Sequence, residues 1–286
     1  MTFFKADASV FVPDGTAPGE AIRRVTHLGI GAHQDDLEIM AFHGIEKCFA
    51  SPELWFGAVT CTDGAGSPRA GEYAGRSDGE MAALRRREQE KAAVLGNYGA
   101  LVQLHYASRE VKDTAPARLR ADLVQLLKAA RPEVVYTHNP ADKHDTHVAV
   151  ALAALGALRD LDPDERPRTV YGCEVWRGLD WMEDGDKVAL DVGRRETLSM
   201  GLIGVYDSQV EGGKRYDLAT AGRRRANASY FQSHAVDEAE QLWFAMDLTP
   251  LVRDPGIEAG RYVLGFVDRF RASVEEKIRR FGAMTR

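Results

Sequence analysis

A histidine and two adjacent aspartates stand together in the segment GAHQDDLE, residues 31–38, directly behind the apolar run at 27–30. A second cluster, THNPADKHDTH at 137–147, contributes three more histidines and two aspartates. Imidazole nitrogen and carboxylate oxygen form the ligand set of catalytic zinc sites, which keep one coordination position open for water. These residue types therefore predict metal binding or proton transfer.

Each cluster follows a predicted strand, at 25–31 and at 133–137. Ligands of open parallel sheets bind beyond the carboxyl ends of the strands, so we expect both clusters at one rim of the sheet. Viewed separately, each cluster has an ordinary explanation, because aspartates after a strand cap helices and polar loops lead into helices. Their equivalent places in the two strand-helix units favour a shared metal site.

The expected ligands of this site are His33, Asp36 and His147. A water in the open position would have its pKa lowered toward about 7. Asp35 is adjacent to a ligand and is expected to act as general base. His144, one helical turn before His147, is expected to donate a hydrogen bond to a developing oxyanion.

The elements that must position these residues alternate between short apolar runs and helical patterns, which predicts an α/β fold, a Rossmann-like, mainly parallel sheet flanked by helices. Ser77 and Glu80 form a Ser-x-x-Glu capping box, and Gly96 is expected to end the helix that starts there. The glycine-rich loop at 62–79 is long and is expected to lie near the active site. The expected strands are 25–31, 54–60, 101–106 and 133–137, and the expected helices are 36–49, 79–96, 115–130 and 145–159.

The pattern loosens beyond residue 165, where strands are expected at 168–176, 187–192 and 241–248 and helices at 195–206, 221–233 and 257–283. There is no internal repeat and no linker-like segment. We therefore expect one domain over 1–286, with a core at about 23–160 and an elaborated C-terminal part at about 161–286.

Composition narrows the range of partners. The 286 residues have a net charge of −6 with both signs mixed throughout, which argues against nucleic acid and anionic membranes as partners. The longest apolar run, at 148–158, is too short to span a bilayer, so no membrane insertion is expected. The three cysteines are widely spaced and odd in number, which favours a reducing, cytoplasmic location. Assembly into a homo-oligomer remains open.

Four segments of the sequence resemble the LmbE-like family, also called the PIG-L deacetylase family. They are GAHQDDLE at 31–38, TDGAG at 62–66, ALRRREQEKAAVLG at 83–96 and HNPADKHDTH at 138–147. The resemblance implies an LmbE-like fold and a Zn²⁺-dependent enzyme, with another divalent metal as the alternative. Such enzymes remove the acetyl group from N-acetylglucosamine-type sugars on lipids, thiol precursors, chitobiose or antibiotic scaffolds, so the implied partner is a small N-acetylated sugar.

Carried across by motif, the resemblance makes His33 and Asp36 metal ligands and Asp35 the base. His147 would complete the metal shell, and His144 would stabilise the tetrahedral intermediate or protonate the amine.

The chain departs from the family pattern at three positions. Gln34 replaces a proline, which alters loop stiffness but no ligand. Thr146 stands where the family commonly has Asp or Asn, and Asp142 or Asp145 is expected to orient the neighbouring imidazole instead. His43 replaces a glycine and is expected to be a packed or surface helix residue rather than part of the site.

Substrate-binding residues are less visible in the sequence. Trp176, Arg177 and Asp180 could stack on a sugar ring and bind its hydroxyls, although Trp176 is equally compatible with packing at a strand end. Arg85 matches an arginine recurrent in the family, with an ion pair to Glu88 as the alternative role. The arginine run at 223–225 is typical of a solvated helix face.

Three alternatives compete with the deacetylase hypothesis. Gly29 and Gly31 begin a dinucleotide-binding fingerprint, but Gln34 occupies its third glycine position. A non-catalytic relative acting as a metal-binding module is the second. The third is a metal-dependent amidase on a non-sugar substrate, because water activation by a metal does not select the bond that is cleaved.

Overall fold

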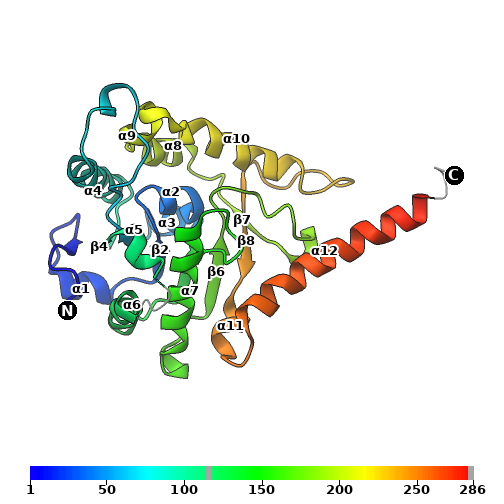
Figure 1. The fold of residues 1–286 in the computed structure, drawn as a ribbon, viewed down its shortest axis with the longest axis horizontal. Helices are drawn as coiled ribbons and strands as arrows, with labels where there is room; N and C mark the ends of the chain where they lie inside the picture. Colours follow the sequence, from blue (N-terminus) through cyan, green and yellow to red (C-terminus); the bar gives the residue numbers. More distant parts are fainter. Residues whose placement is uncertain (114–116, 283–286) are drawn as a thin grey trace.

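The computed structural model describes residues 1–113 and 117–282. Its strands form one eight-stranded sheet in the order β1-β4-β3-β2-β5-β6-β8-β7 (Figure 1). The strands are β1 (Ser9–Phe11), β2 (His27–Gly31), β3 (Phe56–Thr62), β4 (Ala100–Tyr106), β5 (Val134–His138), β6 (Thr169–Cys173), β7 (Val188–Asp191) and β8 (Leu242–Asp247).

The centre of the sheet is parallel and its edges are antiparallel. β4, β3, β2, β5 and β6 pair in parallel, whereas β1 joins one edge and β8 and β7 join the other in antiparallel register. Every residue of β2, β3 and β4 is buried, as expected for parallel strands covered on both faces. The predicted α/β, mainly parallel fold is confirmed.

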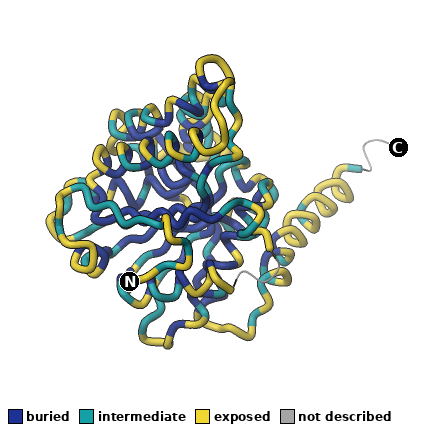
Figure 2. The backbone as a smooth tube through the Cα atoms, turned by 60° about the vertical axis from the view of Figure 1, so that its left-hand side comes forward, coloured by how far each residue is buried: buried dark blue, intermediate teal, exposed yellow. Residues whose placement is uncertain are grey.

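Helices cover both faces of the sheet, so the core has two apolar layers with the buried strands between them (Figure 2). One layer is formed with α1 (Pro18–Arg23), α6 (Ala117–Ala130), α7 (Asp145–Arg159), α11 (Thr249–Arg253) and the start of α12 (Ala259–Phe281). The other is formed with α2 (Asp36–Met40), α3 (Phe42–Cys48), α4 (Asp78–Leu95) and α8 (Glu196–Gly204).

The remaining elements are short or lie around these layers. α10 (Tyr216–Ser229) packs on α8 and β8. The short helices are α5 (Ser108–Val111), α9 (Asp207–Gln209), the π-helix η4 (Val210–Lys214) and the 3₁₀ turns η1 (Gly71–Tyr73), η2 (Pro163–Glu165) and η3 (Asp184–Asp186). No helix within 1–113 or 117–282 combines the length and apolar character that crossing a bilayer requires.

α4 begins and ends as the sequence predicts. Ser77 accepts a hydrogen bond from the Glu80 amide, and the Glu80 carboxylate accepts one from the Ser77 amide at 2.8 Å, which completes the capping box. Gly96 caps the other end with an ordinary φ of −80°, and Asn97 after it adopts the left-handed conformation at φ +52°.

Several expected boundaries were wrong. The helix expected at 36–49 is two helices, because Ala41 leaves helical geometry at φ −108°, ψ 15°. The helix expected at 221–233 runs from Tyr216 to Ser229. β1 and α1 lie before residue 25, where no element is expected, because amphipathic periodicity does not reveal elements of so few residues. Residues 115–116 and 283 of the expected helices lie outside the described residues.

Candidate active site

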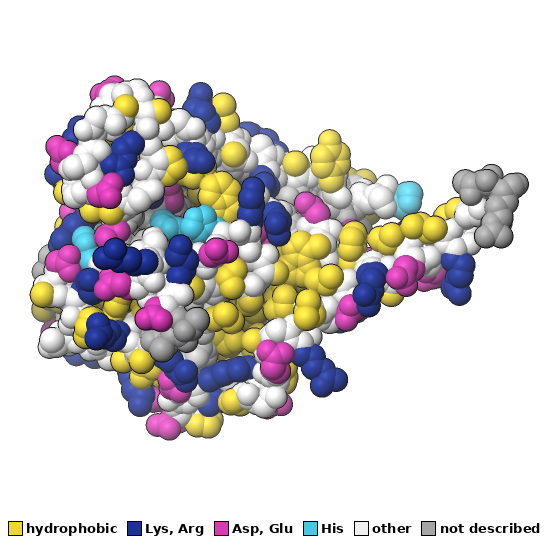
Figure 3. Space-filling view, viewed as in Figure 1, with side chains coloured by type: hydrophobic (Ala, Val, Ile, Leu, Met, Phe, Trp, Pro, Cys, Tyr) yellow, Lys and Arg dark blue, Asp and Glu magenta, His cyan; other side chains and the backbone are white. Residues whose placement is uncertain are grey.

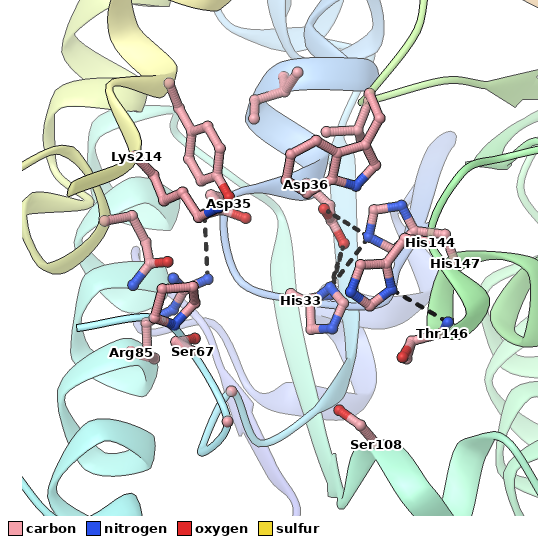
Figure 4. Close-up of a pocket in the computed structure, with 18 of the residues that line it drawn as sticks. His33, Asp35, Asp36, Ser67, Arg85, Ser108, His144, Thr146, His147 and Lys214 are labelled. Atoms are coloured by element: carbon pink, nitrogen blue, oxygen red, sulfur yellow. Dashed lines mark hydrogen bonds and ion pairs between the residues drawn. The ribbon is translucent and has the colours of Figure 1, made fainter. Parts of the chain in front are cut away.

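The loops beyond the carboxyl ends of β2, β3, β5 and β6 enclose a cavity of about 360 Å³, which falls in the size range of small-molecule sites. Figure 3 shows histidine side chains in this hollow, and Figure 4 shows how they converge. The two predicted clusters therefore do meet at one rim. The lining residues are His33, Asp35, Asp36, Ile39, Gly64, Gly66, Ser67, Pro68, Arg85, Ser108, Lys112, His144, Thr146, His147, Val175, Trp176, Gln209, Lys214 and Tyr216.

The turn after β2 is held by Gln34. Its side-chain amide donates to the Thr62 carbonyl at 3.1 Å, which ties the turn to the end of β3. Gly64 lies so close that a Cβ there would stand 2.4 Å from Gln34 Oε1, and its φ is +71°. The positive φ therefore favours glycine at 64, whereas the contact falls on the movable end of the Gln34 side chain.

Three side chains from the two clusters lie at mutual distances that suit a metal ion. His33 Nδ1 is 3.2 Å from His147 Nε2 and 3.4 Å from Asp36 Oδ2, and His147 Nε2 is 3.4 Å from Asp36 Oδ1. Ligands at about 2.0–2.2 Å from a tetrahedral zinc are about 3.3–3.6 Å apart, so this spacing fits the ion. Asp36 and His147 are buried, and the side chain of His33 is 20% exposed.

The charges of this group reinforce one another. Burial by itself would raise the pKa of Asp36, but the His147 imidazole holds this pKa well below its usual range. Burial opposes the charged form of His147 in turn, yet Asp36 and Asp142 raise the pKa of this imidazole. Asp36 is therefore a carboxylate at neutral pH, which is the form that binds a cation.

Asp142 orients His147, whereas Asp145 does not. Asp142 Oδ2 lies 3.2 Å from His147 Nδ1, and Asp142 Oδ1 accepts a bond from the His144 amide at 2.8 Å. The proton on Nδ1 leaves the Nε2 lone pair of His147 facing His33 and Asp36, as in carboxylate–histidine–metal arrangements. Asp145 lies exposed in the first turn of α7, on the outer side of the helix beside Val148 and Leu152.

His138 also belongs to this group, although sequence analysis assigned it no role. Its Nε2 accepts a hydrogen bond from the Ala32 amide at 2.8 Å and lies 3.3 Å from Asp36 Oδ2. Its ring stacks on His147 with the centroids 3.9 Å apart. Burial and the charge of His147 lower the pKa of His138 to about 4, so the ring is neutral. Because its Nε2 lone pair already accepts a hydrogen bond from the Ala32 amide, His138 is not a ligand in this arrangement and instead packs against His147.

Asp35 caps α2 in the left-handed conformation at φ 89°, which Asp tolerates better than most residues. This conformation turns its carboxylate away from Asp36 and toward Arg85, whose Nη2 lies 3.2 Å from Asp35 Oδ2. Arg85 also donates to the Gln34 carbonyl. Burial raises the pKa of Asp35 to about 7, although Arg85 opposes the shift. A carboxyl group with such a pKa suits general base catalysis near neutral pH.

His144 is the N-cap of α7, and its Nδ1 accepts a hydrogen bond from the Thr146 amide at 3.2 Å. The Thr146 backbone thus orients the imidazole. Since Nδ1 is an acceptor, the neutral ring carries its proton on Nε2, which is then a hydrogen-bond donor. Burial, together with the charges of His147 and His33, lowers the pKa of His144 and favours this neutral form.

The geometry allows more than one ligand set. His33, His144 and His147 present nitrogens close enough to share an ion, and so do Asp36, His138 and His147 with their nitrogen and oxygen atoms. His147 belongs to both groups. The hydrogen bond from the Ala32 amide occupies Nε2 of His138. Two ligand sets therefore remain, and both contain His33 and His147. The third ligand is Asp36 in one set and His144 in the other.

Only two of the four expected substrate-binding residues line the cavity. Arg85 is 1% exposed, and its Nε and Nη1 find no hydrogen-bond partner among the described residues. Trp176 stacks toward His144 with ring centroids 6.4 Å apart. Arg177 and Asp180 line a separate groove, because the chain turns away after Trp176 and passes through Leu179 at φ +56°. The structure thus places them outside the catalytic cavity, and their role in substrate binding stays a prediction.

The sequence did not indicate Lys214 and Tyr216 as cavity residues. Lys214 Nζ lies 5.8 Å above the Trp176 ring, and the Tyr216 ring stands 6.0 Å from it, edge to face. Both belong to the junction of η4 and α10, where Gly213 has a φ of +107°. A local turn of this kind has no periodicity from which it could be predicted. His43 of α3, by contrast, forms a hydrogen bond between its Nδ1 and the Tyr136 hydroxyl at 2.8 Å, as expected of a packed residue.

A comparison with protein families finds a match in the N-terminal part of the chain. Residues 28–158 match the family model described as PIG-L: GlcNAc-PI de-N-acetylase. No curated protein sequence matches the chain.

Solved structures share the fold at low sequence identity. A conserved protein from Thermus thermophilus has a TM-score of 0.62 at 18% identity, covering 82% of this chain and 99% of its own. The 4-carboxy-2-hydroxymuconate hydratase from Pseudomonas putida has a TM-score of 0.60 at 16% sequence identity. The match covers 78% of this chain and 96% of the hydratase chain. N,N'-diacetylchitobiose deacetylase from Pyrococcus horikoshii has a TM-score of 0.57 at 19% sequence identity. The match covers 76% of this chain and 82% of the deacetylase chain. Since a hydratase and a deacetylase share the fold, the site must decide the reaction.

Proposed function

We propose, from the PIG-L (LmbE-like) family domain at residues 28–158, that this chain is a zinc-dependent N-deacetylase. Its substrate would be an N-acetylglucosamine-type sugar or glycoconjugate, and its products would be acetate and a free amine. The observation that carries the proposal is the convergence of His33, Asp36 and His147 within 3.4 Å of one another beside a buried carboxylate whose pKa is near 7.

The residues that would hold the ion are His33, Asp36 and His147. A zinc ion bound there supplies positive charge that polarises a carbonyl and lowers the pKa of a bound water to about 7. Asp142 keeps the proton of His147 on Nδ1, so that Nε2 is free to bind the cation.

Asp35 would take the proton from the attacking water. Its carboxylate is buried and its direction is fixed by Arg85, which also limits how far burial raises its pKa. The same carboxyl group, once protonated, can return the proton to the leaving nitrogen, so that one residue serves as base and then as acid.

His144 would donate its Nε2 proton to the oxyanion that forms on the acetamide oxygen. The neutral, Nε2-protonated ring is fixed by the Thr146 amide before the substrate arrives, and such preorganised donors stabilise developing charge efficiently.

The walls of the cavity suit a sugar. Trp176 and Tyr216 offer aromatic faces for a pyranose ring, while Arg85 and Gln209 offer hydrogen bonds to hydroxyl groups. Cys48, Cys61 and Cys173 are free and buried, which supports the reducing cytoplasm as the compartment.

The test is acetate release from a panel of N-acetylated sugars by protein loaded with zinc. We expect acetate and amine in equal amounts, and loss of both in Asp35→Asn. The hydration of an unsaturated acid without acetate release would instead favour the chemistry of the hydratase that shares the fold.

A further inference from the structure

A groove of about 960 Å³ continues from the catalytic cavity at Trp176, which lines both. The described residues that line this groove lie between 176 and 277, and therefore outside the segment 28–158 that matches the family model. The catalytic cavity, at about 360 Å³, is the smaller of the two. A molecule whose acetamide lies at the candidate metal site thus has room to extend past Trp176 into the groove.

Two segments that begin at the cavity form walls of the groove. One runs from Val175 and Trp176 at the cavity to Asp184. The other is α10, whose first residue, Tyr216, lines the cavity. At 1.5 Å per residue, Ala226 lies about 15 Å along the helix from Tyr216, so the groove leads away from the metal site. The residues that α10 contributes to the groove recur at the spacing of one helix face, and they are Leu218, Ala219, Gly222, Arg223, Ala226 and Asn227.

Aromatic rings and unpaired polar atoms occur together along these walls. Trp176, Trp181 and Tyr230 line the groove, and Tyr230 is 85% exposed. Such rings pack well against the C–H faces of a pyranose, whose rim carries hydroxyl groups. A site with large aromatic surfaces and a few directed polar groups is typical of small-molecule recognition.

Two oxygen atoms converge beside Gly178 in the groove. A Cβ built at Gly178 would stand 3.4 Å from Asp180 Oδ1 and 3.7 Å from Asn227 Oδ1. The Asn227 amide is fixed in orientation, because its Nδ2 donates to the Leu242 carbonyl at 3.1 Å. Asp180 has no hydrogen bond or ion pair with the residues that the structure describes. Both oxygens are therefore placed to accept hydrogen bonds from hydroxyl groups of a ligand.

Charged side chains line much of the groove, but their charges nearly cancel. The cations are Arg177, Lys187, Arg223 and Lys277, and the anions are Asp180, Glu183 and Asp184. Lys187 pairs with Asp184 at 2.8 Å. Arg223 donates to the carbonyls of Val175 and Trp176 at 3.0 and 3.1 Å, which holds the corner between cavity and groove in place. Such a lining gives no strong field for an anion, and an acyl chain would desolvate its charges, whereas a neutral sugar can hydrogen-bond to them.

We infer that the groove binds a second sugar ring, joined by a glycosidic bond to the N-acetylated sugar at the metal site. This inference rests on the proposed function, since it extends the substrate of that reaction from one sugar to at least two. Trp176 forms the corner over which the glycosidic bond passes. Asp180 and Asn227 accept hydrogen bonds from the hydroxyl groups of the second ring.

The first test compares three substrates of the zinc-loaded protein: N-acetylglucosamine, its octyl glycoside and N,N'-diacetylchitobiose. We expect kcat/KM for the disaccharide to exceed that for the monosaccharide by about 10- to 100-fold, because ring stacking and hydrogen bonds in the groove add to binding. Equal values for the two sugars would overturn the inference. An octyl glycoside that gains as much as the disaccharide would also overturn it, since apolar contact alone would then explain the gain.

Gly222→Leu places a side chain in the groove at a distance from the metal site. A Cβ built at Gly222 meets no atom within 4 Å, and leucine has a higher helix propensity than glycine, so the variant should fold. We expect the advantage of the disaccharide over the monosaccharide to disappear. The matched control is Gly204→Leu at the end of α8, where a Cβ likewise meets no atom within 4 Å. It should keep the full advantage, and the same advantage in folded Gly222→Leu protein would contradict the inference.

Calorimetry separates a failure of this inference from a failure of the proposed function. Titration of Asp35→Asn protein with N,N'-diacetylchitobiose measures binding without turnover. We expect saturable binding that Asp180→Ala and Gly222→Leu each weaken by about 10-fold and Gly204→Leu leaves intact. This binding pattern without acetate release from either sugar would reject the deacetylase and retain the groove as a sugar site. Acetate release with equal affinity for monosaccharide and disaccharide would reject the groove alone.

Discussion

His33 Nδ1 lies 3.2 Å from His147 Nε2, although the two residues are 114 positions apart in the chain. One stands after β2 and the other in the first turn of α7, and the parallel pairing of β2 with β5 brings the two segments together. Two imidazole nitrogens at this distance, beside the Asp36 carboxylate, need either a shared proton or a cation between them. The Asp36 carboxylate, with one oxygen 3.4 Å from each imidazole nitrogen, fits our proposal of a shared cation.

Metal content is the first prediction. We expect about one equivalent of zinc per chain, removed by a chelator together with activity, and restored with it. His147→Ala should lose the metal, because it removes an atom that lies within 3.4 Å of both other ligands. Elemental analysis after desalting gives the stoichiometry. Full zinc occupancy in folded His147→Ala protein would eliminate this ligand set.

Asp35→Asn should keep the metal and lose turnover by about 10²- to 10⁴-fold, the range of general base catalysis. Asparagine is chosen because it tolerates the left-handed φ of 89° at this position, so the turn is preserved. The measurement is kcat together with zinc content. An Asp35→Asn enzyme with the kcat of the unchanged protein would assign the base to another residue.

The pH dependence of the same carboxyl group follows from its pKa. Burial raises the pKa of Asp35 to about 7, so kcat/KM should fall as the pH drops and the base becomes protonated. A cation bound to the neighbouring Asp36 favours the carboxylate, so the acidic limb should lie below 7 in the zinc-loaded enzyme. This acidic limb should be missing from the pH profile of the residual activity of Asp35→Asn. If the variant and the unchanged protein show the same limb, it reports the titration of another group.

Asp142 and Asp145 offer a matched pair. Asp142→Asn should weaken zinc affinity by about 10- to 100-fold, because it disturbs the bond that keeps the His147 proton on Nδ1. Asp145→Asn, made three residues further on at an exposed position, should change nothing. Competition with a fluorescent chelator measures both affinities. Equal losses in the two variants would point to the charge of the loop rather than to the orientation of His147.

Sequence reasoning could identify both chemical clusters but could not choose between these two aspartates. The strands were predictable because each is a short apolar run, and parallel pairing then placed His33 and His147 at one rim. Within a polar loop, however, Asp145 is the nearer of the two to His147 along the chain, and yet Asp142 is the one that contacts the ring. The Asn139 side chain accepts a hydrogen bond from the Ala141 amide at 2.7 Å, and the turn that this bond holds directs Asp142 toward His147.

The C-terminal third was the least predictable part, because its residues are placed by tertiary contacts. The arginine run at 223–225 was interpreted as a solvated face, yet Arg224 is 1% exposed and donates to the carbonyls of Glu38 and Ile39 at the end of α2. Those carbonyls have no partner further along α2, so a buried guanidinium satisfies them. No local signal distinguishes Arg224 from its neighbours.

His144→Ala separates the two roles that the geometry allows for this residue. As an oxyanion donor, His144 contributes to kcat only, and its loss should lower kcat by about 10²- to 10³-fold with zinc retained. As a ligand with His33 and His147, it would release the metal instead. Zinc content measured beside kcat distinguishes the outcomes, and metal loss in this variant would replace Asp36 by His144 in the ligand set.

Glu174 predicts a pH-dependent stability. It is 1% exposed at the end of β6, and burial together with the charge of Asp142 raises its pKa to about 7 against the opposing charges of Arg177 and Arg223. Because the unfolded-state pKa is near 4.5, the folded protein keeps this proton longer. The stability that it contributes is therefore complete below about pH 4.5 and is lost as the pH rises through 7.

Glu174→Gln removes the ionisation that opposes folding at high pH. We expect this variant to be more stable by about 3 kcal/mol at pH 8 and nearly equal to the unchanged protein at pH 4.5, since each pKa unit between about 4.5 and about 7 corresponds to about 1.4 kcal/mol. Urea unfolding at the two pH values measures the difference. Glu53→Gln, at an exposed glutamate, is the control and should show no such trend. A gain for Glu174→Gln that is the same at both pH values would mean that packing, not ionisation, governs this position.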